Sequence, residues 1–493
     1  MGIEIEQVDF SHADVRQYRA RLEDNLDTLD QLLRTPGFGT GPGSFGAELE
    51  MYLVDRQGNP LMVNAEVLAA AQDPRLTLEL NRYNLEFNLP HSALDARPFL
   101  AAETAMVNML KKLEPIAARW DGRIVAIGIL PTLRETDFGV ACITDRRRYH
   151  ALTRQLIQRR GGHFRVRIDG EDPLQLEMAD ITLEGANTSF QLHYRVSPDA
   201  YADTFNAVQL ATPLALAIAG NSPTLFGHRL WQETRVPLFK QSIDTRHLDP
   251  YGCARPPRVG FGLGWVRRGA LEMFREVVRV YEPLLPICAP RSPQEQLAAG
   301  EVPSLAELRL HQSTVWLWNR PIYDDAGDGH LRIEMRALPA GPTAVDMAAN
   351  AALLVGLAEG LRPHLDELLA AIPFHYAQYN FYRAAQHGLA ANLVWPRGLR
   401  GTVEERSAGD ILAELLPVAA RGLAAIGIDS GEIDYYLEVI EARLANGQTG
   451  ARWQLAMLEK LRRQQPLERA LHNMLERFIG FSAENLPVAR WPL

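Results

Sequence analysis

The stretch F-G-A-E-L-E-M-Y-L-V-D at residues 45–55 predicts a β-strand with one apolar and one acidic face. Successive side chains of a strand point to opposite faces, so Glu48 and Glu50 would share a face, about 7 Å apart. Two carboxylates this close repel each other unless a cation or an arginine lies between them, and a hard divalent metal such as Mg2+ satisfies them best. A solvent-facing edge strand is the alternative that the stretch leaves open. The other face would pack into a core through Ala47, Leu49, Met51 and Leu53.

Three later stretches repeat this alternation of apolar and polar side chains. N-L-E-F-N carries Glu86 on its polar face, F-Q-L-H-Y-R-V carries Gln191 and His193, and L-R-I-E-M-R carries Glu334 and Arg336. An antiparallel sheet with helices on one face shows this pattern. If the four strands belong to one sheet, their polar faces form a concave surface on which acids hold Mg2+ and arginine holds phosphate or carboxylate.

The composition is that of a globular protein with few lysines. The 493 residues are enough for one large catalytic unit or for about two to three domains, and 47% of them are hydrophobic. The net charge of -9 argues against a nucleic-acid partner, for which a basic surface is expected. Four of the 51 basic residues are lysines, so bound anions would be held mainly by arginine, metal and backbone N–H groups.

The cysteines and the apolar segments indicate a reducing compartment. Cys142, Cys253 and Cys288 form neither a C-x-x-C pair nor a disulfide framework, so neither zinc nor disulfides are implied. The first residues lack the apolar core of a signal peptide, and no apolar run is long enough to span a bilayer. We therefore expect a cytoplasmic protein without a membrane partner.

Three common catalytic frameworks are disfavoured by their sequence context. The G-x-G-x-x-G formed by Gly41, Gly43 and Gly46 contains a proline and precedes a strand, whereas the dinucleotide-binding fingerprint follows a strand and opens a helix. The chain has no G-x-x-x-x-G-K-[ST], which excludes a P-loop ATPase, and no local signature of a serine or cysteine nucleophile. Metal-assisted chemistry on phosphate-bearing or carboxylate substrates remains.

Hydrophobic periodicity predicts helices around these strands. They fall at residues 14–34, 64–71, 98–119, 145–160, 199–219, 267–281 and 304–308, and the chain is almost wholly helical from 346 onward. A hairpin is expected over 161–184 and a buried strand over 123–131. The helix at 145–160 begins with a basic run that includes Arg148 and Tyr149, for which a solvated cationic face is the ordinary interpretation. A turn at Asn221 precedes a basic cluster made of Arg229, Arg235, Lys240 and Arg246.

Six motifs in order resemble the bacterial glutamate-cysteine ligase family of the second type. They are G-A-E-L-E at 46–50, N-L-E-F-N-L-P at 84–90, F-Q-L-H at 190–193, A-G-N-S-P at 219–223, I-E-M-R at 333–336 and N-F-Y-R-A-A-Q-H-G-L at 380–389. These enzymes are carboxylate-amine ligases related to glutamine synthetase. The resemblance implies an α+β fold in which a curved antiparallel sheet forms an open funnel or half-barrel, covered outside by helices, with a helical C-terminal part.

The resemblance also implies an activity and a set of site residues. ATP would phosphorylate the side-chain carboxylate of glutamate, and cysteine or another small amine would attack the acyl phosphate to give an amide. Arg336 and Glu50 would be catalytic, with Arg336 stabilising the transferred phosphoryl group. The expected ligands of Mg2+ or Mn2+ are Glu48, Glu50, Glu86, His193 and Glu334. The expected substrate-binding residues are Arg148, Tyr149, Gln191, Asn221, Arg235 and Arg246.

Many family members carry a second histidine two residues before the strand histidine, where this chain has Gln191, so the identity of the acceptor amine stays open.

We expect a catalytic domain over residues 1–400 and a helical extension over 401–493 that packs on it. The expected enzyme belongs to glutathione biosynthesis, uses small amino acid and amine substrates, and could form a homo-oligomer. The alternatives are a guanidino or carboxylate kinase on the same sheet and a homologue that binds a ligand without turnover.

Overall fold

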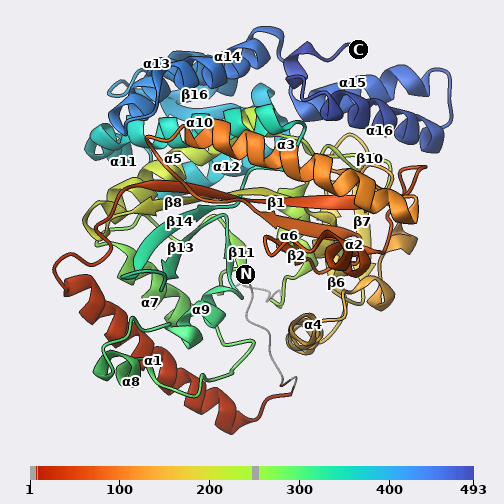
Figure 1. Cartoon of the computed structure of the whole chain (residues 1–493). Coiled ribbons are helices and arrows are strands. Elements are labelled where there is room, and N and C mark those ends of the chain that lie inside the picture. Colours follow the sequence, from red (N-terminus) through yellow and green to blue (C-terminus); the bar gives the residue numbers. More distant parts are fainter. Residues whose placement is uncertain (1–6, 8, 247–254) are drawn as a thin grey trace.

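A curled antiparallel sheet forms the centre of the molecule (Figure 1). The computed structural model describes residues 7, 9–246 and 255–493. The strand order is β13-β14-β8-β1-β3-β2, and β4 and β5 pair with the two ends of β1. The strands are β1 (Ser44–Val54), β2 (Leu76–Leu78), β3 (Asn84–Asn88), β4 (Ser92–Ala93), β5 (Arg123–Val125), β8 (Phe190–Val196), β13 (Asn319–Asp324) and β14 (His330–Met335). The expected half-barrel is confirmed.

The register of the sheet brings the four predicted polar faces together. Glu50 of β1 pairs with Glu86 of β3, and Glu48 pairs with Gln191 of β8. On the other side of β8, His193 pairs with Glu334. Strand β1 therefore lies inside the sheet between β3 and β8, and the alternative of a solvent-facing edge strand is wrong.

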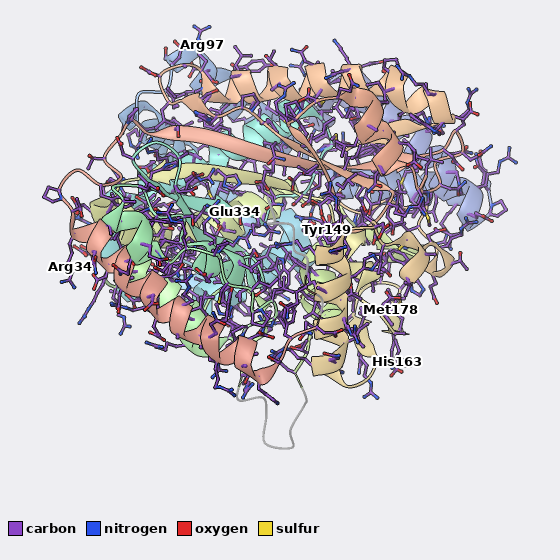
Figure 2. All side chains as sticks on the ribbon, turned by 60° about the horizontal axis from the view of Figure 1, so that its bottom comes forward. Arg34, Arg97, Tyr149, His163, Met178 and Glu334 are labelled. Carbon is purple, nitrogen blue, oxygen red and sulfur yellow. The ribbon has the colours of Figure 1, made fainter. Side chains whose placement is uncertain are left out.

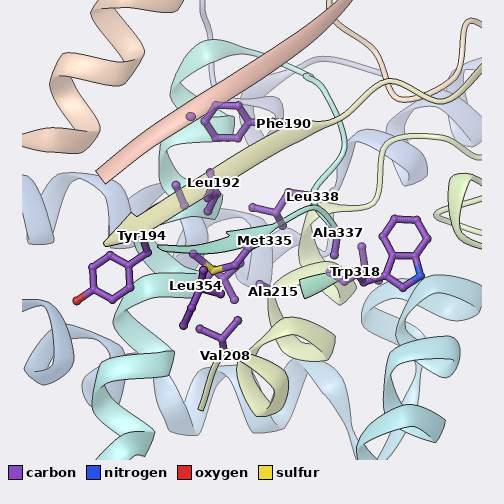
Figure 3. Packing of buried hydrophobic residues seen from close by; sticks show 14 of the residues in the cluster. Phe190, Leu192, Tyr194, Val208, Ala215, Trp318, Met335, Ala337, Leu338 and Leu354 are labelled. Atoms are coloured by element: carbon purple, nitrogen blue, oxygen red, sulfur yellow. The ribbon is translucent and has the colours of Figure 1, made fainter. Parts of the chain in front are cut away.

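Helices cover the apolar face of this sheet (Figure 1). The covering helices include α3 (Pro98–Ala117), α5 (Tyr201–Ala219), α10 (Ala344–Leu361) and α12 (Phe374–His387), with α13 (Ala408–Ala425) and α14 (Ser430–Asn446) outside them. Figure 3 shows Leu192 of β8 and Met335 of β14 packed with Leu354 of α10 and Val208 of α5, all buried. The strand alternation thus buries one face and leaves the acids on the other.

The remaining elements surround the open face or extend the helical layers. The helices are α1 (His12–Arg34), α2 (Asn64–Ala71), α4 (Arg147–Arg160), α6 (Arg235–Ser242), α7 (Ala270–Val280), α8 (Pro293–Ala298), α9 (Ala306–Gln312), α11 (Leu365–Ala371), α15 (Gly450–Arg462) and α16 (Leu467–Ala483). The small strands are β6 (Phe164–Ile168), β7 (Leu174–Met178), β9 (Thr224–Leu225), β10 (His228–Arg229), β11 (Val259–Gly260), β12 (Trp316–Leu317), β15 (Asn392–Pro396) and β16 (Val403–Ser407). The predicted helices and the 161–184 hairpin are confirmed, with ends shifted by a few residues.

The end of β1 belongs to a second hydrophobic core. Tyr52 and Val54, which follow Glu50 on the same face of the strand, are fully buried there. Their cluster includes Trp453 of α15 and Phe478 of α16. The acidic face of β1 is therefore closed at this end by the C-terminal helices. A domain boundary at residue 400 stays a prediction, since α10 and α13 on its two sides share the main core.

Two expectations differ from the structure. The predicted strand over 123–131 is β5 alone, because the backbone after it bonds to an irregular segment: Thr188 donates to the carbonyl of Ile127, and its N–H donates to that of Gly128 at 3.0 Å. The C-terminal part also contains one hairpin, β15 and β16.

By length and composition Ala344–Ala371 could cross a membrane, but 94% of its most apolar window is buried, as in a core helix. Cys142 and Cys288 are free thiols, and Cys253 lies outside the described residues.

Candidate active site

The open face of the sheet forms a strongly charged cavity of about 310 Å³. Helix α4 contributes to its wall opposite the sheet, and Figure 2 shows Tyr149 of α4 and Glu334 of β14 near the middle of the view. Six carboxylates line the cavity: Glu48, Glu50, Glu79, Glu86, Glu184 and Glu334. Four guanidiniums line it as well: Arg146, Arg148, Arg320 and Arg336. The cavity therefore suits a ligand that carries phosphate together with cations.

One group of possible metal ligands lies where β1, β8 and β14 meet. Glu48, His193 and Glu334 each offer a ligand atom, and these atoms lie within 4.8 Å of one another. His193 Nε2 is 3.0 Å from Glu48 Oε1 and 3.9 Å from Glu334 Oε1. Burial acts to raise the pKa of Glu48, but the charge and hydrogen bond of His193 outweigh it and lower this pKa to about 2. The Glu48 carboxylate is thus held in its charged form.

A second group lies where β1 meets β3 and the end of β2. The ligand atoms of Glu50, Glu79 and Glu86 also lie within 4.8 Å of one another. Burial raises the pKa of Glu50 to about 7 against the opposing charge of Arg336, and it raises the pKa of Glu79 and Glu86 as well. Each of these charges destabilises its neighbour, which is the electrostatic condition that a bound cation relieves.

Neighbouring side chains fix the orientation of this second group. Glu50 accepts hydrogen bonds from the N–H of Ser189 at 2.7 Å and from Gln191 Nε2 at 2.8 Å. Glu86 accepts from Thr77 Oγ1 and from Asn88 Nδ2, both at 2.8 Å. Such outer partners hold a ligand oxygen in place and leave its other lone pairs for a metal.

Two arginines flank Glu334 and complete the charged surface. Arg320 Nη2 lies 3.1 Å from Glu334 Oε1, and Arg336 Nη1 lies 3.3 Å from Oε2. Arg336 also donates to the Gln191 side-chain oxygen. Burial acts to lower the pKa of Arg336, but Glu334, Glu50 and Glu48 raise it above its usual value, so the guanidinium stays charged. A phosphoryl group in the cavity would meet two fixed positive charges.

Comparison with known proteins identifies the family. The family model described as glutamate-cysteine ligase family 2 matches residues 44–473. The chain belongs to this family. The members are ATP-dependent carboxylate-amine ligases, so this glutamate-cysteine ligase family 2 protein is an ATP-dependent carbon–nitrogen ligase. The expectation from its six motifs is confirmed.

One solved structure supports the fold of this family member. A glutamate-cysteine ligase from Francisella tularensis in complex with AMP has a TM-score of 0.50 at 12% identity, covering 92% of this chain and 90% of that one. A bifunctional glutathione synthetase from Pasteurella multocida has a TM-score of 0.48 at 10% identity, and the alignment covers 94% of this chain and 55% of that one. No curated protein sequence matches the chain.

Three of the predicted substrate residues of this family member line the cavity. Arg148 Nη2 donates to Ser313 Oγ at 3.0 Å, and the Tyr149 hydroxyl donates to the carbonyl of Leu78 at 2.8 Å. These bonds hold the start of α4 against β2 of the sheet and against the end of α9. Gln191 bridges Glu50 and Arg336. The basic run of α4 is therefore part of the cavity wall and not only a solvated face.

The other three predicted substrate residues do not line the cavity. Asn221 is buried and donates to the carbonyl of Ala340 at 2.8 Å. Arg235 is 2% exposed and bonds to Glu233 at 2.6 Å. Arg246 pairs with Asp244 at 2.8 Å. The geometry gives no support for their substrate-binding role, because the first two side chains are committed to buried protein contacts and the third lies outside the lining residues.

The lining residues that were not predicted from the sequence include Glu79, Glu184 and Arg320. Glu79 had a signal, since Thr77 and Glu79 alternate with leucines in L-T-L-E-L. Arg320 follows the apolar stretch V-W-L-W at 315–318, in which no alternation of polar residues marks a polar strand face. Glu184 lies in a short 3-10 turn without periodicity, and burial together with the charge of Glu50 raises its pKa to about 7.

Proposed function

We propose that this ligase activates the side-chain carboxylate of glutamate with ATP and joins it to a small amine such as cysteine. The carboxylate oxygen would attack the γ-phosphorus and release ADP. The amine nitrogen would then attack the acyl carbon, and inorganic phosphate would leave as the amide forms and the nitrogen loses its proton. The observation that carries the proposal is the convergence of two groups of possible metal ligands and two partly buried arginines, Arg320 and Arg336, in one cavity.

The residues present fit divalent cations. Glu50, Glu79 and Glu86 offer carboxylate oxygens alone, the donor set that Mg2+ and Mn2+ prefer. Glu48 and Glu334 with His193 would hold a second ion, and the Nδ1 atom of His193 is buried without a hydrogen-bond partner in the described part of the chain. A divalent cation held by these residues would supply the positive charge that phosphoryl transfer from ATP requires.

The protein groups have separate roles in this proposal. Arg336 would contact the transferred phosphoryl group, and Arg320 would support it from the neighbouring strand. Arg148 and Tyr149 on α4 would bind a substrate across the cavity from the sheet. Gln191 would keep Glu50 and Arg336 at a fixed separation through its two hydrogen bonds. Glutathione biosynthesis and a homo-oligomer remain predictions, and so does the cytoplasm, which is expected from the cysteines and the apolar segments.

The test is ADP release with ATP, Mg2+ and glutamate, measured against a panel of amines that includes cysteine, alanine, ethylamine and ammonia. We expect ADP release to depend on both glutamate and one amine, with an equimolar amide product seen by mass spectrometry. ADP release with glutamate and no amine would favour the kinase alternative. If glutamate gives no ADP release with any amine of the panel, the choice of glutamate or of a small amine is overturned.

A further inference from the structure

Glu184 is an acid of the cavity wall that belongs to neither group of possible metal ligands. It lies in the 3-10 turn η4 (Thr182–Ala186), between the β6–β7 hairpin and β8. Among residues 9–246 and 255–493, no side chain forms a hydrogen bond or ion pair with its carboxylate. A partly buried carboxylate without a protein partner is poorly compensated, so the position favours a ligand of positive charge.

The backbone around Glu184 is fixed on both sides. Asp180 Oδ1 accepts from the N–H of Thr182 at 2.9 Å, and Asn81 Nδ2 donates to the Thr182 carbonyl at 2.8 Å. On the other side, the Tyr52 hydroxyl donates to the Ala186 carbonyl at 2.5 Å. Gly185 leaves no room for a side chain, because a Cβ atom there would lie 2.3 Å from Asn81 Nδ2. A carboxylate mounted this rigidly, yet unpaired, is organised in advance for binding.

The surroundings of Glu184 restrict the kind of ligand. Its charge interacts with those of Glu50 and Arg336, so it lies beside the groups assigned above to the reacting phosphate. The same cavity has an apolar wall formed by Leu152, Leu156, Ile181 and Ile243. The other five carboxylates of the cavity lie in the two possible metal sites, and its guanidiniums repel a cation. Glu184 is therefore the carboxylate left for an organic cation.

Resting on the proposed ligase function, we propose that Glu184 binds the ammonium group of the acceptor amine. The acceptor class is then a primary amine that enters the cavity positively charged, and the carboxylate of Glu184 places its nitrogen beside the activated acyl group. The ammonium gives one proton to this carboxylate before the neutral nitrogen attacks the acyl carbon, and the nitrogen loses its second proton as the amide forms and phosphate leaves. Specificity for a charged acceptor would come from this one charge–charge contact, and the apolar wall would bind the rest of the acceptor.

The test compares Glu184→Gln with the wild type, using the amine found in the panel and hydroxylamine, which is mostly uncharged at neutral pH. For the charged amine we expect KM to rise by about 10- to 100-fold, because a charge-assisted hydrogen bond is lost. KM for ATP, the Mg2+ dependence and the rate with hydroxylamine should stay within about twofold of the wild type. Glu438→Gln, an exposed acid of α14, is the matched control.

The outcomes separate this inference from the proposed function. An unchanged KM for the charged amine, or an equal loss with hydroxylamine, would overturn the ammonium contact. A raised Mg2+ requirement would make Glu184 a metal ligand instead. Glu184→Asp, which keeps the charge, should retain part of the selectivity for charged amines and covers the case in which the glutamine variant unfolds. A wild type that releases no ADP with any amine would instead remove the proposed function, and the inference with it.

Discussion

Glu50 connects the two parts of the cavity that we propose bind the metal and the phosphoryl group. It shares a group with Glu79 and Glu86, and through Gln191 it is linked to Arg336. We predict that Glu50→Gln reduces Mg2+-dependent ADP release by more than the roughly 10- to 100-fold typical of outer metal partners. The amide keeps the shape but removes the charge that a cation needs. Steady-state ADP release and thermal melting measure the two effects, and full activity in a folded variant would remove Glu50 from the site.

Glu79 provides an independent test of the proposed metal site that it forms with Glu50 and Glu86. Its carboxylate completes the group with Glu50 and Glu86, and it lies just after β2. We predict that Glu79→Gln raises the Mg2+ concentration for half-maximal activity by at least about tenfold, with a smaller change in the rate at saturating Mg2+. A Mg2+ titration of ADP release measures this, with Glu438→Gln as the control. A titration curve identical to that of the wild type would contradict the assignment.

At the scale of elements, the alternating strands were predictable and the irregular segments were not. Side chains two residues apart on β1, β8 and β14 share a face, so the pattern alone placed Glu48, His193 and Glu334 on one surface. Glu184 lies in a turn that is held by hydrogen bonds from Tyr52 and Asn81, which are distant in the sequence. Hydrophobic periodicity gives no signal for such bonds. Arg235 and Arg246, predicted from their charge, do not line the cavity, and the buried pairing of Arg235 with Glu233 cannot be seen from charge alone.

The bond from β1 to η4 should have a measurable effect on stability. Tyr52→Phe removes the hydroxyl that donates to the carbonyl of Ala186 and leaves this buried acceptor unsatisfied. We predict a loss of about 1–3 kcal/mol in the free energy of unfolding, measured by urea denaturation. Tyr435→Phe, in which a 48% exposed ring loses its hydroxyl, is the matched control and should change it by less than about 0.5 kcal/mol. An equal loss of stability in Tyr52→Phe and Tyr435→Phe would argue against the hydrogen bond from Tyr52 to Ala186.

At the scale of the whole molecule, the cavity couples cation binding to stability. The pKa of Glu50 is raised from 4.5 to about 7 in the folded chain. The folded state therefore binds more protons than the unfolded state in this range, and stability falls as the pH rises through it. A divalent cation needs the deprotonated carboxylates, so we predict that Mg2+ raises Tm more above pH 7 than about one unit below it. Calorimetry at both pH values tests this, with Glu50→Gln as the control. A Mg2+ effect independent of pH would contradict it.

Strand β1 is anchored in two cores at once, and this links the last helices of the chain to the proposed chemistry. Glu50 is followed two positions later by Tyr52, whose ring lies in the cluster with Trp453 and Phe478. A substitution that disturbs the packing of α15 or α16 would then displace Glu48 and Glu50 through β1, although neither helix lines the cavity. Heat-sensitive defects selected in α15 or α16 should consequently appear as lost turnover before the protein melts.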